Sequence, residues 1–268
     1  MKQRSLTLTT ITAFGYALLY LPIASVVIYS FNDSRLVTLW GGFSTRWYAS
    51  LLSDEELLAA ALLSLRIAFI SATLATALGL LVALALQRVR RLRGRMFLSG
   101  MITAPLVMPE IITGLSLLFL FISMANLLGW PAARGATTIT IAHITFSMAY
   151  VVVVLRSRLA SMDETLEDAA MDLGGRPVAV FFDITIPMLR PALVSGWLLA
   201  FTLSLDDLVI SSFVSGPGAT TLPMLIFAKV RLGVTPDINA ITTIIIALVA
   251  TAVAVAAVLS NKRKAGTA

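Results

Sequence analysis

Three carboxylates lie in stretches of sequence that are otherwise apolar. Asp206 and Asp207 stand side by side in SLDDLVISSF (204–213), and Glu110 lies in APLVMPEIITG (104–114). A carboxylate at bilayer depth costs about 2.5–3.5 kcal/mol, so such residues usually serve a function or have an internal partner. Ionised carboxylates in this setting are suited to hold a cation.

The spacing of polar residues assigns helix faces to these acids. Asp207 shares a stripe with Ser204 and Ser211, whereas Asp206 points about 100° away. A straight-helix rise of about 1.5 Å per residue puts Glu110 and Asp207 at similar depths in the outer half of the bilayer. We therefore expect Asp207 and Glu110 to face a translocation path, and Asp206 to have a structural or gate role.

Internal pairing is the alternative explanation for the acids. The candidate basic partners are Arg66, Lys229 and Arg231. The single histidine of the chain, His143, lies in an apolar stretch, where an interhelical hydrogen bond is the expected role rather than a substrate contact.

The composition that surrounds these residues is that of a membrane protein. Hydrophobic residues make up 58% of the 268 residues and charged residues only 13%, against about 25% in a typical soluble domain. Without cysteine there is no disulfide or Cys-ligated metal, and one histidine argues against a His-based metal cluster or a Ser-His-Asp triad. No G-x-x-x-x-G-K-[ST] phosphate loop occurs. We expect neither an enzyme nor a metal site, and energy for uphill transport must come from another chain or an ion gradient.

Six apolar stretches are long enough to cross a membrane as helices, which need about 20 residues each. They cover residues 9–31, 58–86, 96–124, 136–158, 191–214 and 239–260. Small residues recur at intervals of four in the second stretch and predict close helix packing; they are Ser71, Ala75, Gly79 and Ala83. The sequence therefore predicts an all-α membrane protein with a single transmembrane domain over residues 1–268.

Most of the 20 Lys and Arg residues fall in connections that would share one side of the membrane. The positive-inside rule then places both termini in the cytoplasm. The basic run QRVRRLRGR (87–95) is explained as a topology signal between two spans, so we expect membrane lipid rather than nucleic acid as its surroundings.

The connection over residues 159–190 predicts a helix–turn–helix at the cytoplasmic face. Ala169, Ala170 and Leu173 form one small apolar face of the first short helix, and Gly174 is a good residue to end it. A small flat face allows close approach, which suits docking of a partner protein. A loop that only covers the helix bundle is the alternative.

The second short helix is expected to begin at Pro177, a favoured first helical residue. Val178, Phe181 and Phe182 would give it an apolar side that anchors the loop in the protein. Pro187 would end it before the next span.

The stretch DAAMDLGGRPVAVFFDITIP (168–187) resembles the EAA loop of ABC importer permease subunits. The family pattern is E-A-A, three residues, G, nine residues and I-x-L-P. The matching residues are Asp168, Ala169, Ala170, Gly174, Ile184 and Pro187, with Asp168 in place of Glu and Ile186 in place of Leu. The resemblance covers nearly the whole chain and is closest to the putrescine permease subunits of the polyamine branch, through residues 31–48, 101–118 and 195–227.

This resemblance implies a type I ABC importer permease fold, with five core spans and one extra helix, in the inner membrane of a bacterium. It implies a sibling permease subunit, two cytoplasmic ATPase subunits that bind ATP, and a periplasmic polyamine-binding protein. This chain would bind no cofactor itself and would form the translocation pathway for polyamines. The ATPase would dock on the EAA loop, at Asp168, Ala169, Ala170, Leu173 and Gly174.

Two other functions fit the residues. In a gradient-driven secondary carrier or cation channel, Glu110, Asp206 and Asp207 would be proton or cation sites. A membrane subunit that does not transport would use the same acids only for structure. Within the polyamines, the sequence is as compatible with spermidine or cadaverine as with putrescine.

Overall fold

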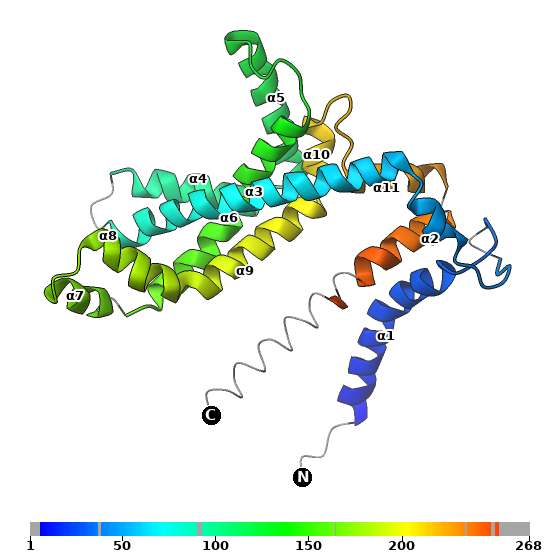
Figure 1. Cartoon of the computed structure of the whole chain (residues 1–268), viewed down its shortest axis with the longest axis horizontal. Coiled ribbons are helices and arrows are strands. Elements are labelled where there is room, and N and C mark those ends of the chain that lie inside the picture. Colours follow the sequence, from blue (N-terminus) through cyan, green and yellow to red (C-terminus); the bar gives the residue numbers. More distant parts are fainter. Residues whose placement is uncertain are drawn as a thin grey trace. The chain divides into compact units, whose positions relative to one another are not determined.

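The computed structural model describes residues 6–36, 39–89, 93–163, 165–233, 235–247 and 250–251. The helices (Figure 1) are α1 (Leu6–Tyr29), α2 (Arg46–Leu51), α3 (Glu55–Arg88), α4 (Arg95–Val107), α5 (Glu110–Leu128), α6 (Ala136–Ala160), α7 (Thr165–Asp172), α8 (Pro177–Val180), the π-helical turn η1 (Phe181–Thr185), α9 (Ile186–Leu205), α10 (Val209–Val214) and α11 (Leu222–Leu232). Two compact units contain them, one of residues 1–58 with 226–268 and one of residues 59–225.

Within the described residues, five helices are long and apolar enough to cross a membrane. They are Leu8–Tyr29, Glu55–Arg88, Glu110–Leu128, Ala136–Ala160 and Pro177–Leu205. The expected all-helical membrane architecture is confirmed to this extent. Of the sixth expected span, 239–260, the structure describes a shorter apolar helix, Pro236–Ala247, and most of the remainder lies outside the described residues.

The third expected span is not one helix. The prediction of a continuous helix over 96–124 is wrong, because α4 ends at Val107 and α5 begins at Glu110. Between them Met108 is extended, with φ −74° and ψ 138°. Pro109 explains the break, since proline has no N–H and disfavours the α conformation of the preceding residue.

The fifth expected span, 191–214, is wrong at both ends. The helix begins at Pro177 and continues through η1 and α9 to Leu205, so Pro187 lies in the first turn of α9 and ends nothing. The π-helical turn that precedes Pro187 changes the spacing of the carbonyls that a proline ring would meet in an α-helix. At the other end the helix stops before Asp206, and α10 begins only at Val209.

The core of the unit of residues 59–225 is formed where α3 and α9 pack on α6. A Cβ at Gly79 would lie 2.8 Å from Val151 Cγ1, and one at Gly196 would lie 3.4 Å from the same atom. Ala75 and Ala83 are fully buried beside them. The packing role predicted for the small residues of α3 is therefore confirmed.

The unit that contains α1 is held together by polar contacts in its loops. The buried side chain of Asn32 accepts from the Gly41 N–H at 2.8 Å and donates to the Leu39 carbonyl at 2.7 Å, which fixes the loop after α1. Lys229 pairs with Asp54 at 2.8 Å and lies 3.8 Å from Asp237. Lys229 therefore has carboxylate partners within its own unit.

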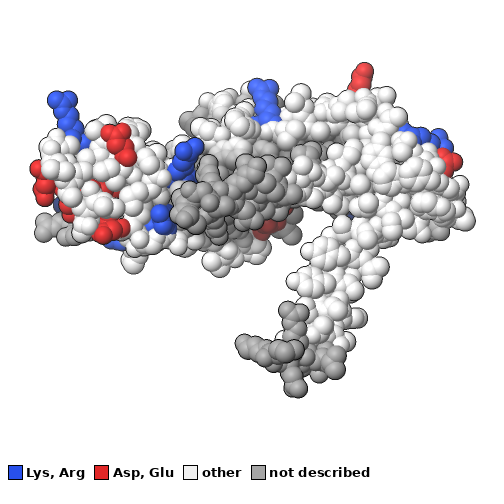
Figure 2. Space-filling model, turned by 60° about the horizontal axis from the view of Figure 1, so that its bottom comes forward, with Lys and Arg blue, Asp and Glu red and all other residues white. Residues whose placement is uncertain are grey.

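Charged side chains are distributed unevenly over the surface. Figure 2 shows acidic and basic residues gathered at the end of residues 59–225 that carries α7 and α8, while the surface of α1 is uncharged. None of the most apolar window of α1 is buried by other described residues. An exposed apolar helix of this length is expected to face lipid or another membrane subunit.

Candidate functional site

Asp207 lies in the break between α9 and α10 and caps the second of these helices. Its Oδ1 accepts from the Ile210 N–H at 3.2 Å, and its Oδ2 accepts from the Ser211 N–H at 2.7 Å. The first N–H groups of a helix have no partner within the helix, and a carboxylate at this end is also favoured by the helix dipole. Asp207 therefore stabilises the start of α10 inside an apolar region.

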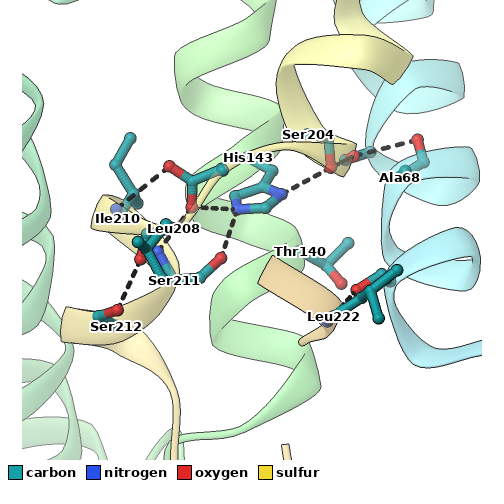
Figure 3. Close-up of polar contacts among 12 residues, drawn as sticks. Ala68, Thr140, His143, Ser204, Leu208, Ile210, Ser211, Ser212 and Leu222 are labelled. Carbon is teal, nitrogen blue, oxygen red and sulfur yellow. Dashed lines mark hydrogen bonds and ion pairs between the residues drawn. The ribbon is translucent and has the colours of Figure 1, made fainter. Parts of the chain in front are cut away.

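His143 of α6 is the interhelical partner of Asp207. Its Nε2 lies 3.1 Å from Asp207 Oδ2 and 3.0 Å from Ser211 Oγ, and its Nδ1 lies 2.6 Å from Ser204 Oγ (Figure 3). Ser71 of α3 extends the chain of contacts, since its Oγ donates to Ser204 Oγ at 2.9 Å. These five residues, here called the Asp207 network, join α3, α6, α9 and α10. The interhelical hydrogen bond predicted for His143 is confirmed.

With a proton on His143 Nε2 and none on Nδ1, the contacts of the Asp207 network form one chain of hydrogen bonds. Ser71 then donates to Ser204, Ser204 donates to His143 Nδ1, and His143 Nε2–H donates to the Asp207 carboxylate. The His143 and Asp207 side chains are only 2% and 6% exposed. In this arrangement the Asp207 carboxylate is enclosed by donors from His143 and from the Ile210 and Ser211 backbone.

The structure reverses the placement expected for the two aspartates. Asp207 was expected to stand open toward a path, but its side chain is buried and bonded to an internal partner. Asp206 was expected to have a structural or gate role; its side chain is exposed, and its backbone N–H ends α9 by donating to the Thr202 carbonyl at 3.1 Å. The partner of Asp207 is His143, and neither Arg66 nor Arg231 makes a salt bridge in the described part of the chain.

Glu110 is the first residue of α5 and is exposed. One turn further, α5 touches α10, because a Cβ at Gly114 would lie 2.7 Å from Phe213 Cδ2 and 3.3 Å from Ile210 Cα. Glu110 is thus about 6 Å along the helix axis from the contact with α10. The structure brings the two helix breaks into the same region, although the straight-helix rise that predicted their depths fails at Pro109.

Residues 165–180 form the predicted helix–turn–helix, here called the coupling hairpin. Gly174 has φ +90°, a left-handed conformation that favours glycine, and α7 ends directly before this turn. The Gly175 N–H donates to the Ala170 carbonyl at 2.9 Å and closes the turn. The second helix begins at Pro177 as expected.

The residues expected to meet an ATPase lie at the surface of the coupling hairpin. Asp168, Ala169, Leu173 and Gly174 are exposed, Leu173 by 91%, and Ala170 is half-buried. The apolar side expected for the second helix is wrong for two of its three residues. Phe182 is 61% exposed and Val178 70%, Phe181 is half-buried, and Val180, which was not expected to anchor the loop, is buried.

The anchor of the hairpin is polar and involves Glu167. Its carboxylate forms a bidentate salt bridge with the guanidinium of Arg88, in which Nη2 lies 2.7 Å from Oε1, and Thr185 Oγ1 also donates to Oε1 at 2.7 Å. We call these three residues the latch. The Arg88 guanidinium, with help from Thr185, holds the pKa of Glu167 below its usual range despite the burial of the carboxylate. Sequence analysis missed this pairing because it joins residues 79 positions apart.

A family model supplies the class of protein. The model described as "Binding-protein-dependent transport system inner membrane component" matches residues 75–264, which include the coupling hairpin and the Asp207 network apart from Ser71. The chain belongs to this family and is therefore an integral component of an inner membrane transport system.

Individual relatives narrow the class. The chain is 59% identical over 239 residues to the "Putrescine transport system permease protein PotI" of Escherichia coli K12, which covers 89% of this chain and 85% of the relative. It is 43% identical over 233 residues to the "Spermidine/putrescine transport system permease protein PotC" of the same strain, covering 87% and 86%. The family expected from the EAA-like loop is confirmed.

A solved structure shows the same fold. The chain is similar to one from a bacterial ABC transporter involved in the import of the acidic polysaccharide alginate, with a TM-score of 0.71 over 96% of this chain and 95% of that one. Sequence identity is only 17%, so the likeness concerns the fold alone.

Proposed function

We propose that this chain is the transmembrane subunit of an ATP-driven importer and forms the translocation pathway for polyamines, with putrescine as the preferred substrate. The observation that carries the proposal is the 59% identity, over 89% of the chain, to a putrescine permease. The 43% identity to a spermidine/putrescine permease supports the wider class of linear polyamines.

In this proposal the chain works in a complex and binds no cofactor itself. A sibling permease subunit, two cytoplasmic ATPase subunits that bind ATP, and a periplasmic polyamine-binding protein complete the importer. The chain lies in the bacterial inner membrane with both termini in the cytoplasm. Its ATPase docks on the exposed surface of the coupling hairpin, at Asp168, Ala169, Ala170, Leu173 and Gly174.

The pathway residues in this proposal are Glu110, Asp206 and Asp207. Glu110 and Asp206 are exposed and form no salt bridge with other described residues, so they are available to an ammonium group. Asp207 acts indirectly, because it stabilises the break between α9 and α10 in which Asp206 lies. Attraction by two exposed carboxylates is modest enough to allow release, as a pathway requires.

The test is uptake by the reconstituted complex, with competition among putrescine, cadaverine and spermidine. We expect ATP-dependent uptake for which putrescine competes best. Glu110→Gln and Asp206→Asn should each raise the KM for uptake by roughly tenfold, as expected for loss of a charge-assisted contact. Asp183→Asn, which neutralises an exposed acid of η1 outside the proposed pathway, is the control and should leave KM unchanged.

Two results would contradict this proposal. Uptake by this chain alone in vesicles without ATP would favour the gradient-driven carrier or channel. Unchanged uptake by both variants in a correctly assembled complex would remove Glu110 and Asp206 from the pathway.

A further inference from the structure

The latch fastens the coupling hairpin to two long helices at once. Arg88 is the last residue of α3, Thr185 ends the π-helical turn that leads into α9, and Glu167 of α7 bonds to both. The Glu167 side chain is only 10% exposed. A buried carboxylate is tolerated when donors surround it, and the planar fork of arginine matches a carboxylate in two hydrogen bonds.

The same two helices also carry the Asp207 network. Ser71 lies near the middle of α3, about 25 Å along the helix from Arg88, and Ser204 lies near the end of α9, about 28 Å along that helix from Thr185. These two serines are bonded to each other, and Ser204 is bonded to His143. Beside this contact, Trp197 Nε1 of α9 donates to Thr73 Oγ1 of α3 at 3.1 Å.

We infer that Arg88, Glu167 and Thr185 are positioning residues that make the coupling hairpin, α3 and α9 move as one body. A displacement of the hairpin is thereby delivered to the break between α9 and α10, where Asp206 and Asp207 lie. The inference rests on the proposed function, because it assigns to the latch the transmission of ATPase movement. It gives the two adjacent acids of α7 different tasks: Glu167 holds the hairpin to the helices, and its neighbour Asp168 remains at the docking surface.

The position of the latch favours a role in transmitting movement from the hairpin to the long helices over a role in folding the hairpin alone. A salt bridge that only folded the hairpin would need no partner on a separate helix. Glu167 bonds to Thr185 at the base of the hairpin and also to Arg88 of α3, 79 residues away in sequence, and both α3 and the helix that contains Thr185 continue to the network. The π-helical turn that contributes Thr185 is also of a kind that often marks functional positions in helices.

The test measures putrescine uptake and ATP hydrolysis together in proteoliposomes that contain the whole complex with its binding protein. In the Glu167→Gln variant we expect the ATPase to co-purify as in the wild type. Uptake per ATP hydrolysed should fall by roughly two- to thirtyfold, the range for mutations along a coupling network. Glu56→Gln, which neutralises an exposed acid in the first turn of α3 outside the coupling hairpin and the latch, is the control and should keep the wild-type ratio.

The outcomes separate the inference from the proposed function. Absence of ATP-driven uptake in the wild-type complex would overturn the proposed function and the inference with it. ATP-driven uptake in the wild type together with an unchanged ratio in Glu167→Gln would overturn the inference alone.

A second measurement covers the case in which Glu167→Gln weakens the hairpin itself. Because the chain has no cysteine, the double variant Arg88→Cys/Glu167→Cys can be joined by a short bifunctional thiol reagent, with cysteine-free partner subunits. Before crosslinking, uptake per ATP should be low. Crosslinking should restore the wild-type ratio without restoring any charge, because the inference requires only that the hairpin and α3 stay fastened. Failure of the crosslink to restore the ratio, or further inhibition by it, would overturn the inference.

Discussion

Two pairs of adjacent acids, Glu167 with Asp168 and Asp206 with Asp207, are arranged alike in different parts of the chain. In each pair one carboxylate is buried and bonded to a base from another helix, and its neighbour is exposed. Glu167 and Asp168 are consecutive residues of a helix, which point about 100° apart, and Asp206 and Asp207 lie in the break between α9 and α10. In both settings a doublet of acids can serve an internal and an external contact at once. Two adjacent acids that look like one charged cluster in the sequence therefore make different contacts in the structure and have separate roles.

The bases that complete the two pairs differ, and the difference follows from their surroundings. Glu167 is paired with Arg88, which is always charged, at the end of the unit where charged residues gather. Asp207 is paired with His143, which can donate to a carboxylate while neutral, between apolar helices. A permanently charged base is costly at bilayer depth, whereas a neutral donor is not. The comparison leads to the following predictions.

The largest loss of stability is expected when Asp207, the buried acid of the Asp206–Asp207 pair (here called the membrane pair), is replaced. Asp207→Ala leaves the Ile210 and Ser211 N–H groups without their acceptor and leaves Ser211 Oγ as the remaining partner of His143 Nε2. Loss of a helix cap and of buried hydrogen bonds should lower the unfolding free energy by about 3 kcal/mol or more. The measurement is thermal unfolding of the purified complex in detergent.

Asp206→Ala is the matched comparison, because it removes an exposed carboxylate one residue away. It should leave the unfolding temperature nearly unchanged, since surface substitutions usually change stability by less than about 0.5 kcal/mol. A greater loss of stability in Asp206→Ala than in Asp207→Ala would show that the assigned roles are reversed.

A smaller effect is expected at the buried acid of the hairpin. Glu167→Ala leaves Arg88 without its carboxylate, but the Arg88 side chain is 28% exposed and water can replace part of the interaction. We expect a local loss of about 1–2 kcal/mol, less than for a fully buried pair. Amide hydrogen exchange in the coupling hairpin should then be roughly tenfold faster.

Asp168→Ala sharpens the contrast within this pair. Hydrogen exchange in the hairpin should stay at the wild-type rate, while less ATPase co-purifies with the complex. If Asp168→Ala also accelerated exchange, the division of the doublet into an anchoring and a docking residue would fail.

Close packing of α5 on α10 also stabilises the region around Asp206 and Asp207. In Gly114→Ala the new Cβ would meet Phe213 and Ile210. Crowding costs about 1–3 kcal/mol, and the better helix propensity of alanine offsets about 1 kcal/mol of it. A net destabilisation of about 1 kcal/mol is expected by thermal unfolding.

Gly100→Ala in α4 is the control for this packing, because no atom lies within 4 Å of a Cβ at that position. It should be neutral or slightly stabilising. Equal effects of the two substitutions would mean that α5 and α10 are not held by close contact at Gly114.

Sequence alone predicted the helical membrane fold and the small-residue packing face of α3, because hydrophobic length and periodicity are local properties. It also predicted the glycine turn of the hairpin and the interhelical bond of His143. It missed the helix break at Pro109, since a long apolar run was given more weight than the conformational restriction that proline imposes on its neighbours.

The partners of the buried acids could not be predicted in the same way. The bond between His143 and Asp207 joins residues 64 positions apart, and that between Arg88 and Glu167 joins residues 79 positions apart. Such pairings depend on how helices pack, which no single segment encodes. Arg88 in particular was assigned only to membrane topology, a role that does not prevent it from also forming the latch.

The smallest expected effect is that of mild acidification on the latch. Arg88 holds the pKa of Glu167 below its ordinary value of 4.5, so on acidification the unfolded hairpin takes up the proton before the folded one. The stabilisation by the latch is thus complete above the unfolded pKa and is lost only as the pH falls through the lower, folded pKa. Hydrogen exchange, corrected for its intrinsic pH dependence, should differ between wild type and Glu167→Gln by a constant factor from about pH 7.5 to about pH 5.5. The difference in exchange rate between the two proteins should become smaller only below the ordinary pKa of a glutamate. If it became smaller in the neutral range, Glu167 would not be held as an ion pair.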